Sequence, residues 1–232
     1  MYKRQVCAPT RSSLLTGRYS LRTGVTDTYN GGAIMSSSEI TLAEIFAEKN
    51  YKTGIFGKWH LGDNYPSRPS DQGFQESLIH LAGGIGQVGD FTNYYAGNES
   101  YFDPTLWHNN EIKKYEGYCS DIFTDEALKF IEQNKSNQFF CYLSFNAPHT
   151  PLQVPEKYYD LYKDIDPSNF YEEVTSEMTE RDVNDAKKIY GMVTNIDENF
   201  GKLLYKLEEL DIKENTIVIF LTDNGPQQTR YV

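Results

Sequence analysis

Segments with a helical spacing of apolar residues alternate along this chain with short, continuously apolar runs. The longest helical segment covers residues 180–210, where apolar side chains recur every three or four positions. Two apolar runs, at 138–145 and 216–221, are predicted as strands, and the second, apolar throughout, has the composition of a strand that is buried on both faces. This alternation predicts an α/β fold with a mainly parallel sheet flanked by helices. The 232 residues suit a single domain, 1–232.

The same patterns predict the remaining elements, which we name by their residue ranges. We expect helices at 8–20, 36–50 and 121–134, a strand at 51–59, a short helix and a loop at 155–170, and long loops with a short helix or hairpin at 62–120.

The net charge of −11 argues against a general nucleic-acid binder, because such proteins carry an excess of positive charge. An anionic substrate must therefore be held by a few local cations. The longest apolar run, IVIFL at 217–221, is far too short to span a membrane. The first residues, MYKRQV, lack the apolar stretch of a signal peptide, so none is expected within this chain.

Polar and charged side chains follow each predicted strand, and two more lie at the start of the first helix. In an open α/β fold, ligands bind at the carboxyl ends of the strands. Each residue has an ordinary alternative, since loop histidines are often exposed, TDNG is a common turn and a lysine can extend to solvent. Their joint placement favours one catalytic site. The residues are Cys7, Arg11, Lys58, His60, His149, Asp223 and Asn224.

Four motifs, in this order, resemble the formylglycine-dependent (type I) sulfatases, an arylsulfatase-like family of the alkaline-phosphatase-like superfamily. They are CAPTR followed by TGR at 7–18, GKWHLG at 57–62, APHTP at 147–151 and TDNG at 222–225. The resemblance covers essentially the whole chain. It implies an alkaline-phosphatase-like fold and a sulfuric ester hydrolase.

The resemblance also implies a role for each catalytic residue. A maturation enzyme would oxidise Cys7 to formylglycine, whose hydrated aldehyde attacks sulfur. Arg11 would hold this group, and Lys58 would contact both it and the sulfate. His60 would assist the release of sulfate, and His149 would donate a proton to the leaving alcohol.

The implied metal is Ca²⁺, or else Mg²⁺, bound by Asp223, Asn224 and residue 7. Hard cations of this kind prefer oxygen ligands. Family members also carry a pair of aspartates upstream of the cysteine and a sulfate-binding lysine beyond the TDNG motif. Neither is found in these 232 residues, so we expect a fragment truncated at both ends, with weak metal binding.

The expected substrate is a sulfated small molecule or glycan, because the Tyr-, Asn- and Gly-rich stretch at 84–120 suits a carbohydrate-binding rim. Three alternatives stay open: a phosphonate monoester hydrolase or phosphodiesterase of the same superfamily, a cysteine hydrolase that uses Cys7 and His149, and an inactive truncated fragment. A full-length protein of this family is expected in the periplasm or outside the cell.

Overall fold

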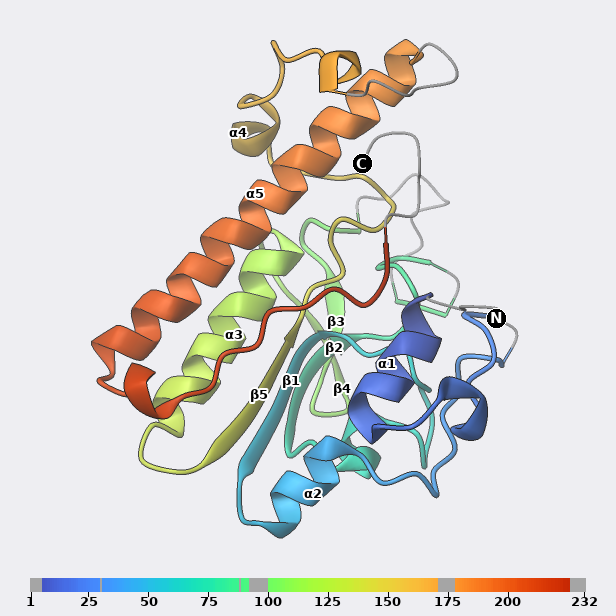
Figure 1. Ribbon diagram of the computed structural model, residues 1–232, viewed down its shortest axis with the longest axis vertical. Helices are drawn as coiled ribbons and strands as arrows, with labels where there is room; N and C mark the ends of the chain where they lie inside the picture. The colour runs from blue at the N-terminus through green and yellow to red at the C-terminus, as the bar shows by residue number, and fades with distance from the viewer. Residues whose placement is uncertain (1–5, 30, 88, 92–99, 171–177, 226–232) are drawn as a thin grey trace.

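The computed structural model describes residues 6–29, 31–87, 89–91, 100–170 and 178–225. Part of the predicted carbohydrate-binding rim, residues 92–99, lies outside the described residues. The predicted α/β class is confirmed, with helices on both faces of one sheet (Figure 1).

The sheet has five strands in the order β4-β3-β2-β1-β5. Strand β1 is parallel to both β2 and β5, whereas β3 is antiparallel to its two neighbours, so the sheet is mixed. The antiparallel part is a tight hairpin, because Asn109 and Asn110 both adopt positive φ angles, of 51° and 67°. The strands are β1 (Lys52–Lys58), β2 (Glu76–His80), β3 (Thr105–His108), β4 (Glu111–Lys114) and β5 (Phe139–Ser144).

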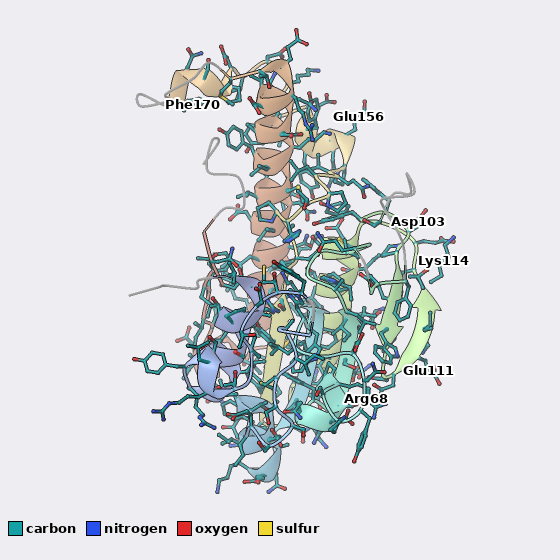
Figure 2. All side chains as sticks on the ribbon, turned by 90° about the vertical axis from the view of Figure 1, so that its right-hand side faces the viewer. Arg68, Asp103, Glu111, Lys114, Glu156 and Phe170 are labelled. Carbon is teal, nitrogen blue, oxygen red and sulfur yellow. The ribbon has the colours of Figure 1, made fainter. Side chains whose placement is uncertain are left out.

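Strand β2 lies in a stretch that the sequence predicted as loop. It is one of the two parallel neighbours of β1, and its register places His80 beside Lys58. The predicted hairpin is β3–β4. Figure 2 shows Glu111 and Lys114 of β4 at the outer edge of the sheet, where all four β4 residues are exposed.

Five α-helices and several short 3-10 helices complete the described part. The α-helices are α1 (Cys7–Thr16), α2 (Leu42–Glu48), α3 (Cys119–Gln133), α4 (Glu156–Tyr159) and α5 (Glu180–Glu209). The 3-10 helices are η1 (Ser20–Arg22), η2 (Pro69–Gln72), η4 (Pro167–Phe170) and η5 (Lys213–Asn215).

Two predicted helices are shorter than expected, for identifiable reasons. Helix α1 ends at Thr16 because Gly17 adopts a left-handed conformation, with φ 67°, and the chain then turns into η1. Helix α2 begins only after Thr41, whose hydroxyl accepts a hydrogen bond from the Glu44 backbone N–H. The Glu44 carboxylate in turn accepts from the Thr41 N–H, so a capping box fixes this start.

Alternate residues of each strand pack on opposite faces of the sheet. Phe56 and Leu78 belong to the core beneath α3, whereas Ile55 and Ile79 belong to the core beneath α1 and α2. Figure 1 shows α5 outside α3 on the first of these faces. None of the described helices has the length and apolar character that crossing a membrane requires.

The predicted strand at 216–221 is wrong. The segment is extended but is not assigned to the sheet, and its apolar side chains are exposed; Ile217 is 90% exposed and Ile219 75%. Among the described residues, β5 is the edge of the sheet and pairs only with β1. An apolar run becomes a buried strand only where a neighbouring strand is present, and within the described residues no strand pairs with this segment.

Candidate active site

Cys7 is the first residue of α1, and Arg11 follows it one helical turn later. Residues four apart lie on the same helix face, so the motif points both side chains toward the end of the sheet. The helix has no side-chain cap, and Val6 at its N-cap position leaves the first N–H groups free. The positive end of the helix dipole therefore acts on Cys7, where it favours an anion.

Arg11 is almost completely buried and joins four segments of the chain. Its Nε donates to the Trp59 carbonyl at 3.1 Å, and its Nη2 donates to the Lys58 carbonyl and to the Ser144 hydroxyl. Its Nη1 lies 3.3 Å from the Asp223 carboxylate. These contacts occupy the guanidinium, so the structure supports a role for Arg11 in assembling the site. Its predicted role of holding the nucleophile stays a prediction.

The Cys7 thiol lies close to three of the predicted residues. Burial alone would raise the pKa of this thiol. Interactions with the His149 and His60 side chains and with the Lys58 ammonium outweigh that effect and lower the pKa to about 5. The unmodified cysteine is therefore a thiolate at neutral pH. The other two cysteines differ, because burial raises the pKa of Cys141 to about 12 and that of Cys119 higher still.

Lys58 ends β1 and is buried, with 3% of its surface exposed. Burial lowers its pKa, and the nearby Arg11 lowers it further, whereas Cys7 and Asp223 raise it. The preceding residue, Gly57, has φ 117°, and a Cβ placed there would lie 2.0 Å from the Ser144 carbonyl oxygen. Only glycine permits this close approach of β1 and β5 next to the site.

His60 has its tautomer fixed by a backbone carbonyl. Its Nε2 lies 2.9 Å from the Thr28 carbonyl oxygen, which can only accept, so Nε2 carries the proton. Its Nδ1 is buried without a hydrogen-bond partner among the described residues. Burial lowers the pKa of His60, although Cys7 opposes this shift. Nδ1 can therefore hold a proton toward the Cys7 thiolate or, when bare, accept a proton from a neutral nucleophile.

His149 is oriented by the same type of contact through its other nitrogen. Its Nδ1 lies 2.7 Å from the Thr150 carbonyl, so Nδ1 donates and Nε2 is left to act on the site. This arrangement suits a residue that gives a proton to a leaving group.

Asp223 and Asn224 meet the metal prediction only in part. The Asn224 Oδ1 atom is buried and has no hydrogen-bond partner in the part of the chain that the structure describes, as expected for an oxygen that binds a cation. Asp223, however, is engaged by Arg11. No group of three or more His, Cys, Asp or Glu side chains suited to a metal is found among the residues that the structure describes. The residues described here do not form a complete calcium site.

Two residues near the site were not predicted from the sequence. Ser144 ends β5, and its hydroxyl donates to the Lys58 carbonyl at 3.0 Å. His80 ends β2 and is fully buried, with its Nδ1 3.7 Å from the Asp90 carboxylate. Their position as the last residues of strands is the signal that could have found Ser144 and His80. For His80 it was hidden, because β2 was predicted as loop.

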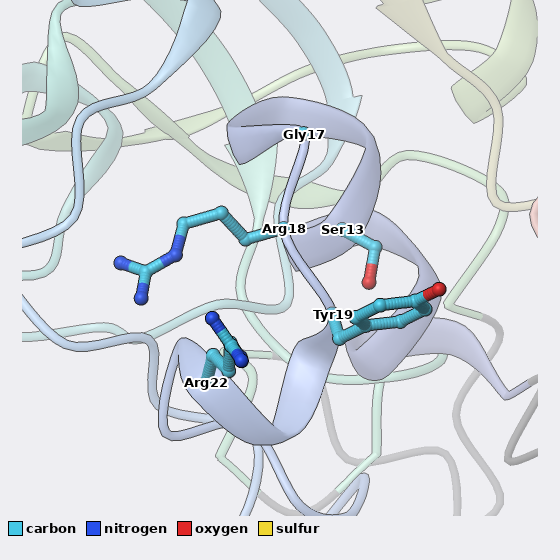
Figure 3. Close-up of a pocket in the computed structure, with 5 residues that line it drawn as sticks. All are labelled: Ser13, Gly17, Arg18, Tyr19 and Arg22. Atoms are coloured by element: carbon cyan, nitrogen blue, oxygen red, sulfur yellow. The ribbon is translucent and has the colours of Figure 1, made fainter.

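A hollow of about 570 Å³ lies at the other end of α1 and is separate from this cluster (Figure 3). Arg18, Tyr19 and Arg22 line it, together with Ser13 and Gly17. Glu39 forms an ion pair with Arg18 at 2.7 Å and so offsets its charge. None of the seven predicted residues lines the hollow, so the chemistry belongs to the cluster around Cys7.

Comparison with known proteins gives a consistent result. The sulfatase family model matches residues 1–230. The chain is 29% identical to an ulvan-active sulfatase of Formosa agariphila, over 95% of this chain and 41% of that protein. It is 30% identical to an arylsulfatase of Hemicentrotus pulcherrimus, over 96% of this chain and 39% of that protein.

Solved structures give the same picture of the fold. The crystal structure of Ps i-CgsB in complex with k-i-k-neocarrahexaose superposes with a TM-score of 0.68 at 28% identity. The match covers 89% of this chain and 45% of that one. The chain thus spans about half the length, or less, of the relatives named here.

Proposed function

The chain belongs to the sulfatase family, and we propose that it contributes the nucleophile, the general acid and base, and the central cation of a sulfuric ester hydrolase. One observation carries this proposal: Lys58, His60 and His149 all act on the Cys7 side chain, which lies at the positive end of a helix. A sulfate ester needs cationic groups where charge accumulates and a proton donor for the leaving alcohol.

The two histidines suit opposite proton transfers. His60 presents a bare Nδ1 because Thr28 holds its Nε2–H, so it would take a proton from the nucleophile or assist the release of sulfate. His149 presents Nε2 to the site because the Thr150 carbonyl accepts from its Nδ1–H, so it would donate to the leaving oxygen from Nε2. Lys58 would hold the sulfate oxygens through charge and hydrogen bonds.

Formylglycine at position 7, which this cysteine would become by oxidation, supplies a hydrated aldehyde oxygen as the nucleophile. The helix N-terminus and Lys58 stabilise an anion of that oxygen as they stabilise the thiolate. Calcium would be shared between Asp223, Asn224 and residue 7, with further ligands from outside the described residues. We assign it no step of the reaction.

The proposed substrate is a sulfated glycan. Two relatives support this class: one is named for activity toward ulvan, and a 28% identical solved structure contains a neocarrahexaose. A phosphonate monoester or phosphodiester stays the alternative, because the same cations and histidines could act on a phosphoryl group.

Two measurements test the proposal. After co-expression with a formylglycine-generating enzyme, peptide mass spectrometry should find the aldehyde at position 7 and thiols at Cys119 and Cys141. The matured protein, extended to the length of its relatives, should hydrolyse 4-nitrophenyl sulfate faster than an aryl phosphonate monoester. The reverse preference would favour the phosphonate alternative, and an unmodified Cys7 beside a converted control sulfatase would overturn the proposal.

Calorimetry with calcium tests the metal part of the proposal separately. The 232-residue chain should bind calcium weakly, because Asp223 supplies the one carboxylate of the proposed set. An extended protein should bind it tightly, and Asp223→Ala should abolish that gain together with activity. Equal, tight binding by both lengths would mean that other carboxylates, such as Asp27 or Asp63, complete the site.

The low pKa of Cys7 favours a second candidate, a cysteine hydrolase that uses the thiolate with His149. That enzyme would be active without maturation and would lose activity on treatment with iodoacetamide. The proposed sulfatase would be inactive before maturation, and iodoacetamide would not inhibit it afterwards, because the thiol at position 7 would have been converted.

A further inference from the structure

A glycine-rich loop follows β2 and packs directly against both catalytic histidines. A Cβ built on Gly83 would lie 2.9 Å from Cε1 of His60. A Cβ built on Gly84 would lie 2.7 Å from Nδ1 of His149 and 2.6 Å from the Thr150 carbonyl oxygen. Real Cβ atoms essentially never approach other heavy atoms this closely, so the two histidines occupy space that a side chain would fill.

Glycine is required at positions 83 and 84 because there is no room for a Cβ atom, not because of the backbone conformation. Neither Gly83 nor Gly84 is among the residues with positive φ, so their backbone conformation is open to other residues. Gly201 in α5 offers a contrast, because a Cβ there would meet no atom within 4 Å.

Hydrogen bonds from within the loop and from Ser100, whose hydroxyl donates to the Ile85 carbonyl at 2.9 Å, hold the loop in this position. The Gln87 side-chain oxygen accepts from the Gly84 N–H at 2.8 Å, within the part of the loop that touches His149. The Asp90 carboxylate accepts from the Gly86 and Phe91 N–H groups, each at 3.0 Å. The loop is therefore fixed by its own side chains and by Ser100, and Asp90 also lies against the buried His80.

We propose that Gly83 and Gly84 are positioning residues, which hold the His60 and His149 rings against residue 7 by packing backbone directly on them. This inference deepens the proposed function and rests on it for its catalytic consequence. The packing itself is a property of the chain that can be tested without activity. Gly83 packs against the His60 ring and Gly84 against the His149 ring, so substituting one glycine should displace one ring more than the other.

Imidazole NMR spectra of the 232-residue chain test the packing. The chain has four histidines, at positions 60, 80, 108 and 149, and single substitutions assign their ring signals. His108, on β3 with its Nδ1 2.6 Å from the Tyr115 hydroxyl, serves as an internal control. The variants are Gly83→Ala and Gly84→Ala, with Gly201→Ala as the matched control.

The expected result is a crossed pattern. Gly83→Ala should displace mainly the His60 signals, Gly84→Ala should displace mainly those of His149, and His108 should keep its position in both. Gly201→Ala should leave the His60, His149 and His108 signals unchanged. Unmoved His60 and His149 signals in both loop variants would overturn the proposal. So would equal displacement of all four histidines, since that indicates a general disturbance of the fold.

A milder variant keeps the test decisive if an alanine variant fails to fold. Gln87→Leu removes the acceptor of the Gly84 N–H and adds no atom to the glycines, so it should displace the His149 signals by a smaller amount. An unchanged His149 signal in Gln87→Leu would then count against the proposal.

Kinetics of the matured, extended protein test the consequence for catalysis. Misplacing a proton donor by about 1 Å can cost roughly a hundredfold in rate, so Gly84→Ala should lower kcat for 4-nitrophenyl sulfate by that order, with a much smaller change in KM. A crossed NMR pattern in a protein that hydrolyses no sulfate ester would refute the proposed function and leave the packing intact. An unchanged kcat in an active enzyme would refute the positioning role alone.

Discussion

Two five-residue stretches of this chain, TGIFG at 53–57 and IVIFL at 217–221, differ in burial, and the more apolar of the two is the exposed one. Residues 53–57 of β1 are all buried between parallel neighbours, and the groups that follow them form the candidate site. Residues 217–221 are extended, lie outside the sheet and are exposed, with Phe220 resting on Phe200 of α5. Yet Asp223, directly beyond this second stretch, still reaches Arg11.

The difference shows what each stretch depends on. β1 is fixed by strands on both sides, by helices on both faces and by the Arg11 contacts at its end. Segment 216–221 is held in the described structure mainly near its ends. The Thr216 hydroxyl donates a hydrogen bond to the Ile212 carbonyl, and Asp223 forms an ion pair with Arg11. The apolar sequence alone therefore does not produce a strand.

The largest effect is expected where β1 approaches β5 most closely. Gly57→Ala places a methyl group 2.0 Å from the Ser144 carbonyl oxygen and forces alanine to adopt φ 117°, so it should lower the free energy of unfolding by more than about 4 kcal/mol. Urea denaturation followed by circular dichroism measures this loss.

Gly201→Ala is the matched control for this substitution. It lies in α5 with no atom near its Cβ position, so it should raise the free energy of unfolding by about 0.5–1 kcal/mol. If Gly57→Ala lowered the free energy of unfolding by less than about 1 kcal/mol, β1 and β5 would separate easily. β1 would then be no more firmly fixed than segment 216–221.

An intermediate effect is expected for the reactivity of the unmodified Cys7. A thiolate forms as the pH rises through the thiol pKa, so alkylation of Cys7 by iodoacetamide should increase around pH 5 and level off near pH 7. Lys58→Met removes a cation that favours the thiolate. Each unit by which the pKa then rises should slow alkylation at pH 4 about tenfold.

Cys141 provides the internal reference for this experiment, because its pKa of about 12 keeps it protonated throughout. Peptide mass spectrometry distinguishes the labelled positions. A Cys7 that reacts only above pH 8, like an ordinary exposed thiol, would show that the histidines and Lys58 do not act on it in solution.

The smallest effect is expected in segment 216–221. Ile219→Lys should change the free energy of unfolding by less than about 0.5 kcal/mol, because this side chain is already 75% exposed. Ile55→Ala, a fully buried control in β1, should cost about 2–5 kcal/mol. Hydrogen exchange should find the amides of 217–221 unprotected. Protection equal to that of β1 would mean that the segment pairs with a strand in solution.

Much of this architecture can be predicted from sequence periodicity. Helix α5 was expected at 180–210 and forms at Glu180–Glu209, and strand β5 was expected at 138–145 and forms at Phe139–Ser144. These elements are long or strongly apolar, and each has a partner to pack against. The strand at 216–221 failed because pairing with a neighbouring strand is a tertiary property. β2 was missed because polar residues interrupt both of its buried faces, Ser77 on one and His80 on the other.

The candidate site was predictable to the level of residue identity but not of contact. The rule that ligands gather at the ends of strands selected Lys58, His60 and His149, and the structure brings all three to Cys7. It could not show that Arg11 contacts protein groups of four residues, namely Trp59, Lys58, Ser144 and Asp223. Nor could it find Gly83 and Gly84, because contact with a ring across the fold leaves no trace in local sequence.

The sequence positions of the partners of Arg11 determine the order in which its contacts can form during translation. Its contacts reach residues 47, 133 and 212 positions further along the chain. At roughly 5–20 residues per second, a ribosome needs on the order of 10–40 s to travel from Arg11 to Asp223. His60 is made 49 residues after Arg11 and His149 138 residues after it, so for part of that interval Cys7 lacks one or both of these histidines. An enzyme that modified this cysteine would therefore find it least enclosed in a nascent chain.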